Sequence, residues 1–455
     1  MEAGSSSSSS SAAAAAAAAE VAAQARSGDV VLCVDAGGTK TLAVAACVEA
    51  QDTFVGQAGC GNCATLGLEA ASQVILGAVR DALISAGFGT FFDLIEAGEA
   101  EGITTPPLSV SDNDASSADG DQDLLSRTSP AATNTSNILR PRVRAIWIGS
   151  AGLSSSAVIG NYRQQLSQLL HEYHLIDDST PIWITNDAVL LSAPMLRDAS
   201  TQSCVCLIAG TGSAGFAFQR TTASSPTLSL DAASATAAAP TADTSENEDL
   251  PGLTTVSKTG GWGYLLGDRG SGWSIGLSTI QLMLTREEER QFAPSPLTDF
   301  ERAVLCALDV DSPIELISAA YRDRVCATGG NFFHAEDARK RWLADTTRVV
   351  FEYAFEDAGR SGKHLAIQLL HQAIGECIES ISKLCCPKDR IRPETSTLVL
   401  GGGLWSNSKF LDLLVKIWKE QGRNGFKNIH VVKSPAHEAA AYLALQFLGS
   451  QTITQ

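Results

Sequence analysis

The stretch that decides the fold is Val30-Val31-Leu32-Cys33-Val34-Asp35-Ala36-Gly37-Gly38-Thr39-Lys40-Thr41-Leu42-Ala43-Val44-Ala45-Ala46-Cys47-Val48. A short apolar run is followed by a polar, glycine-rich turn and then by a second apolar run. This pattern predicts a hairpin of two buried strands. A tight glycine turn lets the backbone approach a ligand closely, and its N–H groups can point at phosphate oxygens.

The same pattern returns in the second half of the chain. Cys204–Ile208 reads as a strand, Ala209–Ser213 as a turn and Gly215–Phe218 as the partner strand. A third glycine turn, Gly401–Gly403, follows the apolar run Thr397–Leu400. Helical patterns separate these strands, so the class is α/β, with one lobe design used twice. Three such turns at strand ends favour phosphate binding, although neither a P-loop nor a dinucleotide GxGxxG unit is present.

Composition divides the 455 residues into folded and unfolded parts. Three segments are rich in Ser, Thr, Ala, Asp or Pro and too poor in large apolar residues to offset the entropy of ordering them. We expect 1–28 to be a disordered Ser/Ala-rich N-terminus, 29–189 an N-terminal lobe with a disordered insert at 102–140, and 190–455 a C-terminal lobe with a disordered insert at 221–256. We leave open that the last helix packs back on the N-terminal lobe.

Charge and cysteine content exclude several classes. The formal net charge is −17, which argues against nucleic acid or an anionic membrane as a partner. No run of about 18 apolar residues predicts a membrane span, and the N-terminal Ala run lacks the basic flank of a signal peptide. Eleven scattered Cys indicate reduced thiols in the cytoplasm. Cys60-Gly61-Asn62-Cys63 is a single CxxC, a weak sign of a metal or redox site.

Two carboxylates at strand ends carry the candidate chemistry. Asp35 stands beside the first turn, where it could hold a water of Mg²⁺. Asp187 follows Ile182–Asn186 at the edge where α/β sheets place ligands, and it is a candidate general base; the alternative is an N-cap. The segment Thr259–Gly272 combines six Gly with Trp262 and Asp268. Close backbone, an aromatic wall and a carboxylate suit a sugar site, and a structural loop is the alternative.

Taken in order, these motifs resemble a known family. Asp35-x-Gly-Gly-Thr-Lys40, Gly61-Asn62, Thr185–Ala188, Gly210–Ser213, Gly260–Gly263 with Gly267-Asp268, and Gly401–Gly403 are similar to the motifs of N-acetylglucosamine kinases. That family lies in the BadF/BadG/BcrA/BcrD ATPase group of the actin-like, hexokinase-like superfamily. The order holds from about Val30 to Phe447 once the inserts are skipped.

The resemblance implies a two-lobe actin-like ATPase (ribonuclease H-like) fold with mixed five-stranded sheets and a ligand cleft between the lobes. It implies transfer of the ATP γ-phosphoryl group to the 6-hydroxyl of N-acetyl-D-glucosamine, with ATP and Mg²⁺ as cofactors and Asp187 as the catalytic base. The implied ATP-binding residues are Asp35 (also for the metal), Gly37, Gly38, Thr39, Lys40, Gly210, Thr211, Gly212, Gly401, Gly402 and Gly403. The implied sugar-binding residues are Asn62, Asp187, Ser213, Gly261, Trp262, Gly263 and Asp268.

One departure leaves the sugar open. Ala214 stands where the animal enzymes have Asn, so one polar contact to the sugar is missing. Glucosamine or another amino sugar is therefore an alternative substrate, and a non-catalytic sugar sensor of the same fold is a second alternative. The expected partner is a small amino sugar. The oligomeric state is open, with a homodimer among the options.

Overall fold

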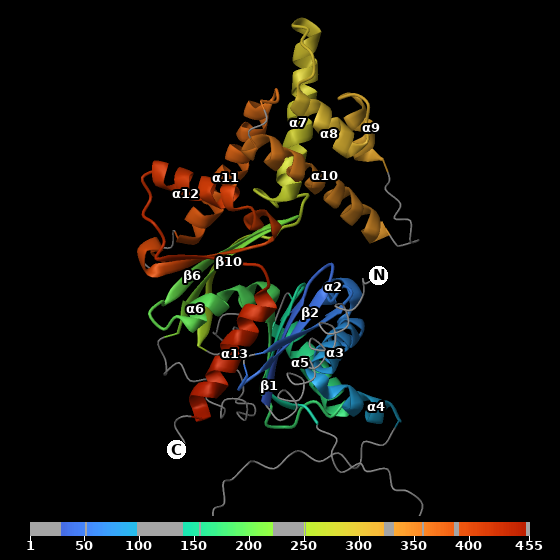
Figure 1. The fold of residues 1–455 in the computed structure, drawn as a ribbon, viewed down its shortest axis with the longest axis vertical. Coiled ribbons are helices and arrows are strands. Elements are labelled where there is room, and N and C mark those ends of the chain that lie inside the picture. Colours follow the sequence, from blue (N-terminus) through green and yellow to red (C-terminus); the bar gives the residue numbers. More distant parts are fainter. Residues whose placement is uncertain are drawn as a thin grey trace, which may run out of the picture. The chain divides into compact units, whose positions relative to one another are not determined.

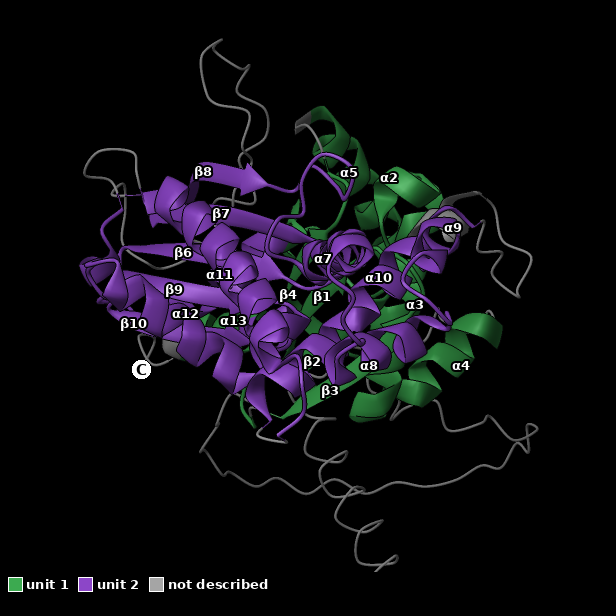
Figure 2. Ribbon diagram, turned by 90° about the horizontal axis from the view of Figure 1, so that it is seen from above, with its two compact units in different colours: residues 1–187, 227–248, 439–455 green, residues 188–226, 249–438 purple. Residues whose placement is uncertain are grey.

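The computed structural model describes residues 29–50, 52–97, 140–153, 156–221, 250, 252–322, 332–356, 359–385 and 391–451. These residues form two compact units: those up to Asp187 and from Ala439 onward form unit 1, and those from Ala188 to Glu438 form unit 2 (Figure 2). The expected disordered segments lie almost wholly outside the described residues.

Unit 1 is built on a five-stranded mixed sheet. Its strands are β1 (Asp29–Ala36), β2 (Thr41–Cys47), β3 (Thr53–Ala58), β4 (Arg142–Ser150) and β5 (Ile182–Asn186), in the order β3-β2-β1-β4-β5. The first three run antiparallel, whereas β1, β4 and β5 run parallel. The carboxyl ends of β1, β4 and β5 therefore meet at one edge, which is where ligands bind in sheets of this kind.

Both faces of this sheet are covered by helices, and successive side chains along each strand point to opposite faces. Leu32 and Ile148 belong to a core cluster that includes buried residues of α3 (Leu68–Leu83) and α5 (Ser156–Glu172). Trp147 points to the opposite face, where its ring meets Tyr442 of α13 (Pro435–Gln451) edge to face at 6.3 Å. Figure 1 shows α13 on one side of the sheet and α3 and α5 on the other.

The helical stretch Leu68–Ala97 bears on the prediction that no apolar run is long enough to span a membrane. It comprises α3, the π-helical turn η1 (Ile84–Phe88) and α4 (Gly89–Ala97), with a kink at Gly87. By length and composition it could cross a membrane, contrary to our expectation that no such run exists, and half of its most apolar window is buried in the protein. Burial of Ile75, Val79 and Leu83 in the unit 1 core accounts for its apolar character.

Unit 2 repeats the sheet of unit 1. Its strands are β6 (Ser203–Ala209), β7 (Ser213–Arg220), β8 (Leu253–Gly260), β9 (Ser396–Gly401) and β10 (Asn428–Val432), in the order β10-β9-β6-β7-β8. The β6, β7 and β8 strands run antiparallel, and β6, β9 and β10 run parallel. The predicted α/β class with two mixed five-stranded sheets is confirmed.

The remaining elements of unit 2 are mostly helices. They are η3 (Asp187–Ser192, whose first residue belongs to unit 1), α6 (Ala193–Arg197), α7 (Gly272–Phe292), α8 (Asp299–Leu308), α9 (Glu315–Tyr321), α10 (Phe332–Phe355), α11 (Lys363–Cys385), η5 (Pro393–Thr395), η6 (Gly403–Ser406) and α12 (Ser408–Glu420). In unit 1, α2 is the short helix Cys63–Leu66.

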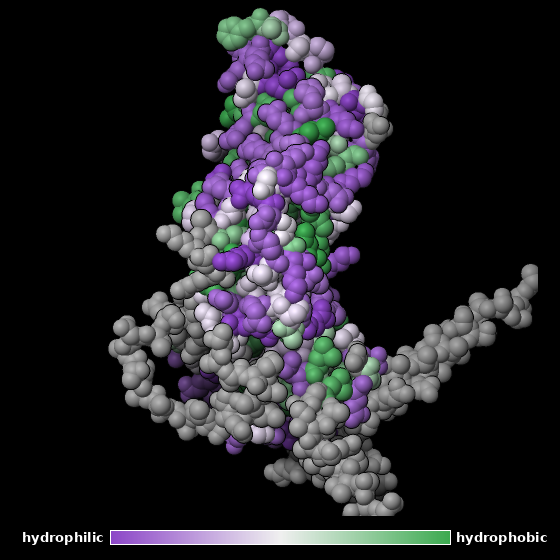
Figure 3. Space-filling view, turned by 90° about the vertical axis from the view of Figure 1, so that its left-hand side faces the viewer, coloured by the Kyte–Doolittle hydropathy of each residue, from purple (hydrophilic) through white to green (hydrophobic). Residues whose placement is uncertain are grey.

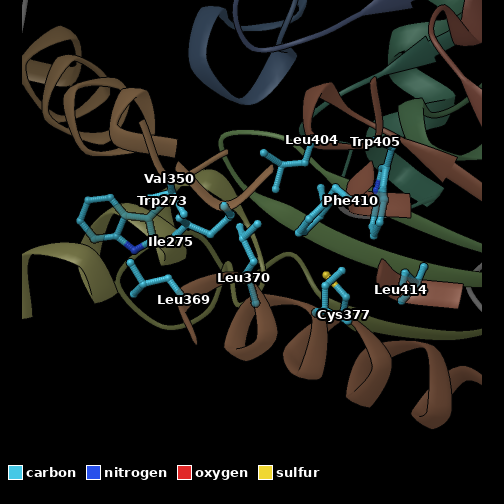
Figure 4. Close-up of a cluster of buried hydrophobic side chains, with 14 of the residues drawn as sticks. Trp273, Ile275, Val350, Leu369, Leu370, Cys377, Leu404, Trp405, Phe410 and Leu414 are labelled. Atoms are coloured by element: carbon cyan, nitrogen blue, oxygen red, sulfur yellow. The ribbon is translucent and has the colours of Figure 1, made fainter. Parts of the chain in front are cut away.

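One apolar core joins the helices α7 to α12 to the sheet of unit 2. Figure 4 shows Trp273 and Ile275 of α7, Leu370 and Cys377 of α11, and Phe410 of α12 within this core. On the face seen in Figure 3, hydrophilic residues cover most of the described surface, with smaller hydrophobic areas between them.

One boundary needs correction. We expected the second insert to extend to residue 256, but β8 begins at Leu253 and pairs with β7 from Arg220 onward. The sequence Leu253-Thr-Thr-Val256 is polar enough to resemble the insert before it. A sheet-edge strand needs apolar side chains on only one face, so the pattern was too weak to mark its start.

Candidate active site

The turn between β1 and β2 opens at the carboxyl edge of the unit 1 sheet. Gly37 N donates to Lys40 O at 3.0 Å, which closes the turn. Gly38, Thr39 and Lys40 are exposed at its tip, whereas Thr41 is buried at the start of β2. The turn therefore presents backbone N–H groups, a hydroxyl and an ammonium group to solvent. This set of donors suits a phosphate.

Two carboxylates stand at the same edge. Asp35 lies in β1 opposite Gly149 of β4, and Asp187 follows the end of β5, where Asn186 pairs with Ser150. The pKa of Asp35 is raised to about 6, first by burial and second by the negative charge of Asp187, while Lys40 opposes both effects. Two acids that share a poorly solvated region repel one another, so the pair favours a cation or a proton between them.

This pair fits a magnesium ion. Mg²⁺ usually takes one or two carboxylates, keeps several waters and fills its shell with substrate phosphates. Asp35, with Asp187 nearby and a glycine turn beside it whose donors suit a phosphate, supplies that set. In the described part of the chain no three His, Cys, Asp or Glu residues group as a metal site, so nothing there supports a structural metal at Cys60 and Cys63. Cys63 Sγ instead donates to Ala151 O at 3.4 Å.

Asn62 is tied to the same turn. Gly61 N donates to Gly37 O at 3.0 Å, so the loop that carries Asn62 lies against the turn. A Cβ on Gly61 would come within 2.3 Å of Thr41 Oγ1, so this close approach needs glycine. Asn62 Oδ1 accepts from Ala64 N at 2.9 Å and caps α2. Its Nδ2 group has no protein acceptor among the described residues and can donate to a ligand.

Unit 2 has its own turn, between β6 and β7. Gly210 N donates to Gly212 O at 2.9 Å within the turn. From α7, Gly272 N donates to Gly210 O at 2.8 Å and Trp273 N donates to Thr211 O at 3.2 Å. The first N–H groups of a helix have no partner inside it. Here the turn supplies their acceptors, and α7 in return fixes the turn.

The glycine triplet after β9 lies beside this turn. Gly402 has φ of +98°, and a Cβ there would lie 2.5 Å from Ala209 O. Only glycine tolerates both the left-handed backbone and this contact. A Cβ on Gly210 would meet Gly403 N at 3.6 Å. Residues 401–403 and 210–212 thus form adjoining backbone surfaces at one edge of the unit 2 sheet.

The loop after β8 covers the start of β7. Gly261 N donates to Ser213 O at 3.1 Å, and Gly260, Gly261 and Gly263 all have positive φ. The backbone therefore turns sharply around Trp262, whose side chain is 67% exposed. A Cβ on Gly261 would lie 3.4 Å from the Cβ of Ala214. Residues 261–263 and Ser213 are neighbours, as a shared sugar site requires.

Asp268 closes this group. Its Oδ1 accepts from Ser213 N at 3.0 Å, and its Oδ2 lies 2.9 Å from Lys340 Nζ, an ion pair that lacks the alignment of a good hydrogen bond. Ser213 Oγ donates to Arg269 O at 2.7 Å. Two of the predicted sugar-binding side chains are therefore also engaged with unit 2 itself. Sequence reasoning missed Lys340, since nothing in a helix 72 residues downstream marks it as a partner of Asp268.

The predicted site residues thus form two groups. Unit 1 brings Asp35, Gly37–Lys40, Asn62 and Asp187 to one edge of its sheet. Unit 2 brings Gly210–Ser213, Gly261–Gly263, Asp268 and Gly401–Gly403 to the corresponding edge of its own sheet. Each sheet edge combines a glycine turn with a carboxylate.

Comparison with known proteins adds one sequence relative. N-acetylmuramic acid/N-acetylglucosamine kinase of Clostridium acetobutylicum is 27% identical to this chain over 155 residues, which are 34% of this chain and 43% of that protein. The chain thus matches less than half the length of this curated relative. No family model matches the sequence.

Solved structures show weaker likeness. A putative N-acetylglucosamine kinase from Chromobacterium violaceum has a TM-score of 0.46 and 16% identity, covering 92% of this chain and 99% of that one. A ROK family glucokinase from Streptomyces griseus, solved with glucose and AMPPNP, has a TM-score of 0.43 and 13% identity, with the same coverage. Scores this low add nothing to what the strand order already shows.

Proposed function

We propose that the protein is an ATP-dependent sugar kinase of the BadF/BadG/BcrA/BcrD group that phosphorylates the 6-hydroxyl of N-acetyl-D-glucosamine. The observation that carries the proposal is the pair Asp35 and Asp187 beside a glycine turn, with the pKa of Asp35 raised by burial and by Asp187. Phosphoryl transfer needs a base or orienting group for the nucleophile and neutralisation of phosphate charge. This edge of the sheet offers both. The curated relative, named as a kinase of two amino sugars, supports the same class.

The residues of unit 1 act on the reacting groups. Asp187 accepts the proton of the 6-hydroxyl as that oxygen bonds to the γ-phosphorus, while the bond from the γ-phosphorus to the β,γ-bridging oxygen breaks and ADP leaves. Asn62 Nδ2 donates to the sugar. Asp35 would hold Mg²⁺ through water, while Thr39, Lys40 and the N–H groups near Gly38 would bind the phosphates. Mg²⁺, when bound, supplies positive charge to the phosphate oxygens.

The residues of unit 2 act mainly in binding. The turn Gly210-Thr211-Gly212 offers N–H groups and a hydroxyl to the phosphates, and Gly401–Gly403 give the adenosine a surface without side chains. Trp262 stacks on the sugar, since its exposed indole is otherwise costly to leave in water. Ser213, Gly261, Gly263 and Asp268 shape the rest of the sugar site.

A second amino sugar as substrate is favoured by one observation. Ala214 stands in place of a polar side chain and its Cβ lies close to Gly261, so residue 214 itself offers the sugar no hydrogen bond; the nearest polar side-chain group to Gly261 is Lys258 Nζ. Glucosamine or another amino sugar would lose less from this absence than a substrate that needs a polar partner at that position.

The test is ATP consumption with four sugars. Purified protein is incubated with Mg·ATP and N-acetylglucosamine, glucosamine, glucose or N-acetylmannosamine, and ADP formation is followed. N-acetylglucosamine is expected to give the highest kcat/KM. A higher value for glucosamine would move the assignment to the alternative substrate. ADP formation with none of the four, in a protein that still binds a sugar, would favour a sensor.

A further inference from the structure

We propose that Lys340 is a positioning residue that neutralises Asp268 and thereby allows the Gly210–Ser213 turn to bind the phosphates of ATP. The inference rests on the proposed function, because it concerns the same nucleotide turn. It adds a residue of α10 that none of the predicted motifs contains. Asp268 becomes in this account a support for the phosphate turn as well as a sugar contact.

Close packing of two helices places Lys340. A Cβ on Gly276 of α7 would come within 2.0 Å of Leu343 O, so α7 and α10 approach as closely as glycine allows. Thr347 Oγ1 donates to Gly272 O at 3.3 Å, and a Cβ on Gly272 would meet Ala344 Cβ at 3.3 Å. Lys340 lies one turn before Ala344 on the same face of α10. It therefore points toward the start of α7 and the turn that α7 supports.

Asp268 is held rigidly under that turn. Its backbone has φ of +55°, an uncommon value for a residue other than glycine. Ser271 Oγ donates to Asp268 O at 2.5 Å, and Ser213 N donates to Asp268 Oδ1 at 3.0 Å. A Cβ on Gly212 would lie 2.8 Å from both carboxylate oxygens. The carboxylate thus touches the backbone that is proposed to face a triphosphate.

The charge of Asp268 is a problem for such a turn. A carboxylate in contact with Gly212, with a side chain only 5% exposed, would repel a nearby phosphate unless a cation offsets it. The neighbouring Arg269 is directed elsewhere, to Glu379 at 3.1 Å and Glu376 at 3.9 Å. Lys340, itself only 21% exposed, lies 2.9 Å from Asp268 and supplies the offset.

The effect of Lys340 on nucleotide binding depends on the charge of Asp268. Removing the ammonium group leaves an unpaired carboxylate beside the phosphates, so nucleotide affinity falls. Where residue 268 is already neutral, removing the ammonium group leaves no uncompensated negative charge, so nucleotide affinity should change little. A role in packing alone would not show this dependence, because both backgrounds lose the same methylene and ammonium contacts.

The experiment is a double-mutant cycle read out by binding. ADP and ATP affinities are measured calorimetrically for the wild type, Lys340→Met, Lys340→Arg, Asp268→Asn and the double variant Asp268→Asn/Lys340→Met. The matched control is Lys416→Met, which removes a lysine from an exposed ion pair with Glu420 on α12. KM for ATP, kcat and the thermal midpoint are recorded for each variant.

We expect Lys340→Met to weaken ATP binding at least about tenfold and to raise the KM for ATP more than it lowers kcat. Lys340→Arg and Lys416→Met should stay within about threefold of wild type, since the charge or the site is preserved. In the Asp268→Asn background, Lys340→Met should change affinity by less than about threefold.

Two results overturn the inference while leaving the proposed function intact. One is wild-type ATP affinity in folded Lys340→Met protein, and the other is an equal loss of affinity in the Asp268→Asn background. If Lys340→Met does not fold, Lys340→Arg and the uncharged double variant decide: loss of ATP binding in both contradicts a charge-balancing role. A wild-type protein that binds no ATP under these conditions overturns the proposed function together with the inference.

Discussion

The glycine turns of the two units occupy the same place in two sheets of the same strand order, yet their carboxylates are treated in opposite ways. In unit 1, burial and Asp187 raise the pKa of Asp35 to about 6, with Lys40 opposing this shift. In unit 2, Asp268 has an N–H group on one oxygen and Lys340 at the other. The first arrangement stores unfavourable charge that a ligand can relieve, and the second is balanced within the protein.

The difference indicates a division of labour. A carboxylate whose negative charge has no close cationic partner in the protein lowers the free energy of unfolding, and such groups cluster at functional sites. An acid that the fold does compensate adds to the rigidity of its surroundings. Unit 1 is thus suited to metal binding and proton transfer, and unit 2 to holding the ligand. Changes at the two sites should therefore differ in sign as well as in size.

The largest effect is expected at Asp187. Asp187→Asn removes the proposed proton acceptor while keeping the size of the side chain, so kcat should fall at least about a hundredfold. Sugar binding should remain largely intact, because the amide can still hydrogen-bond a hydroxyl. Steady-state kinetics and sugar titration by calorimetry measure the two quantities. Near-normal turnover in this variant would remove Asp187 from the mechanism.

The second prediction concerns Asp35. The folded protein binds a proton at this carboxyl more tightly than the unfolded chain does, because its pKa is raised from 3.8 to about 6. The free energy of unfolding contributed by Asp35 therefore falls as the pH rises from about 4 to about 6 and stays low above that range.

Asp35→Asn should consequently stabilise the metal-free protein above pH 6, by up to about 3 kcal/mol, while kinase activity demands much more Mg²⁺. Denaturant unfolding in EDTA at pH 4.5 and pH 8, followed by a magnesium titration of activity, measures both effects. Equal or lower stability of the variant at pH 8 would show that Asp35 is compensated by its surroundings.

The third prediction is the matched change in unit 2. Asp268→Asn can keep the hydrogen bond from Ser213 N but leaves Lys340 without its carboxylate. The free energy of unfolding should fall by about 1–3 kcal/mol, the usual cost of leaving a mostly buried polar group without its partner. The same chemical substitution should thus stabilise the protein at position 35 and destabilise it at position 268. Shifts of the same sign in the two unfolding curves would refute the contrast between the units.

Much of the fold could be predicted because it depends on local patterns. The two strand–turn–strand motifs, the longer helices and the position of Asp187 at a strand end follow from apolar runs and glycine turns. The sequence did not predict the edge strand β3 (Thr53–Ala58). This strand is short, its one fully buried residue is Gly56, and it is held in place by pairing with β2, which local sequence does not show. A Cβ on Gly56 would lie 2.0 Å from Ala78 O of α3, a close approach that shows why glycine stands there.

The sequence predicted only part of the candidate site: the residues at the turns, but not the side chains that pair with them. Residue types at turns predicted the groups that we propose to face a ligand, because those groups follow strands along the chain. The partners that set their charge come from other elements. Lys340 reaches Asp268 because Gly272 and Gly276 let α10 approach α7, and no local pattern reports such an approach.

The central claim is tested most directly by locating the transferred phosphate. Protein, Mg²⁺, ATP and N-acetylglucosamine are incubated, and the sugar product is analysed by phosphorus and proton NMR. The account predicts one phosphomonoester, coupled to the protons on carbon 6, formed in equal amount to ADP and nearly absent with Asp187→Asn. Phosphate on another oxygen, or ADP formed with no phosphorylated sugar, would contradict it.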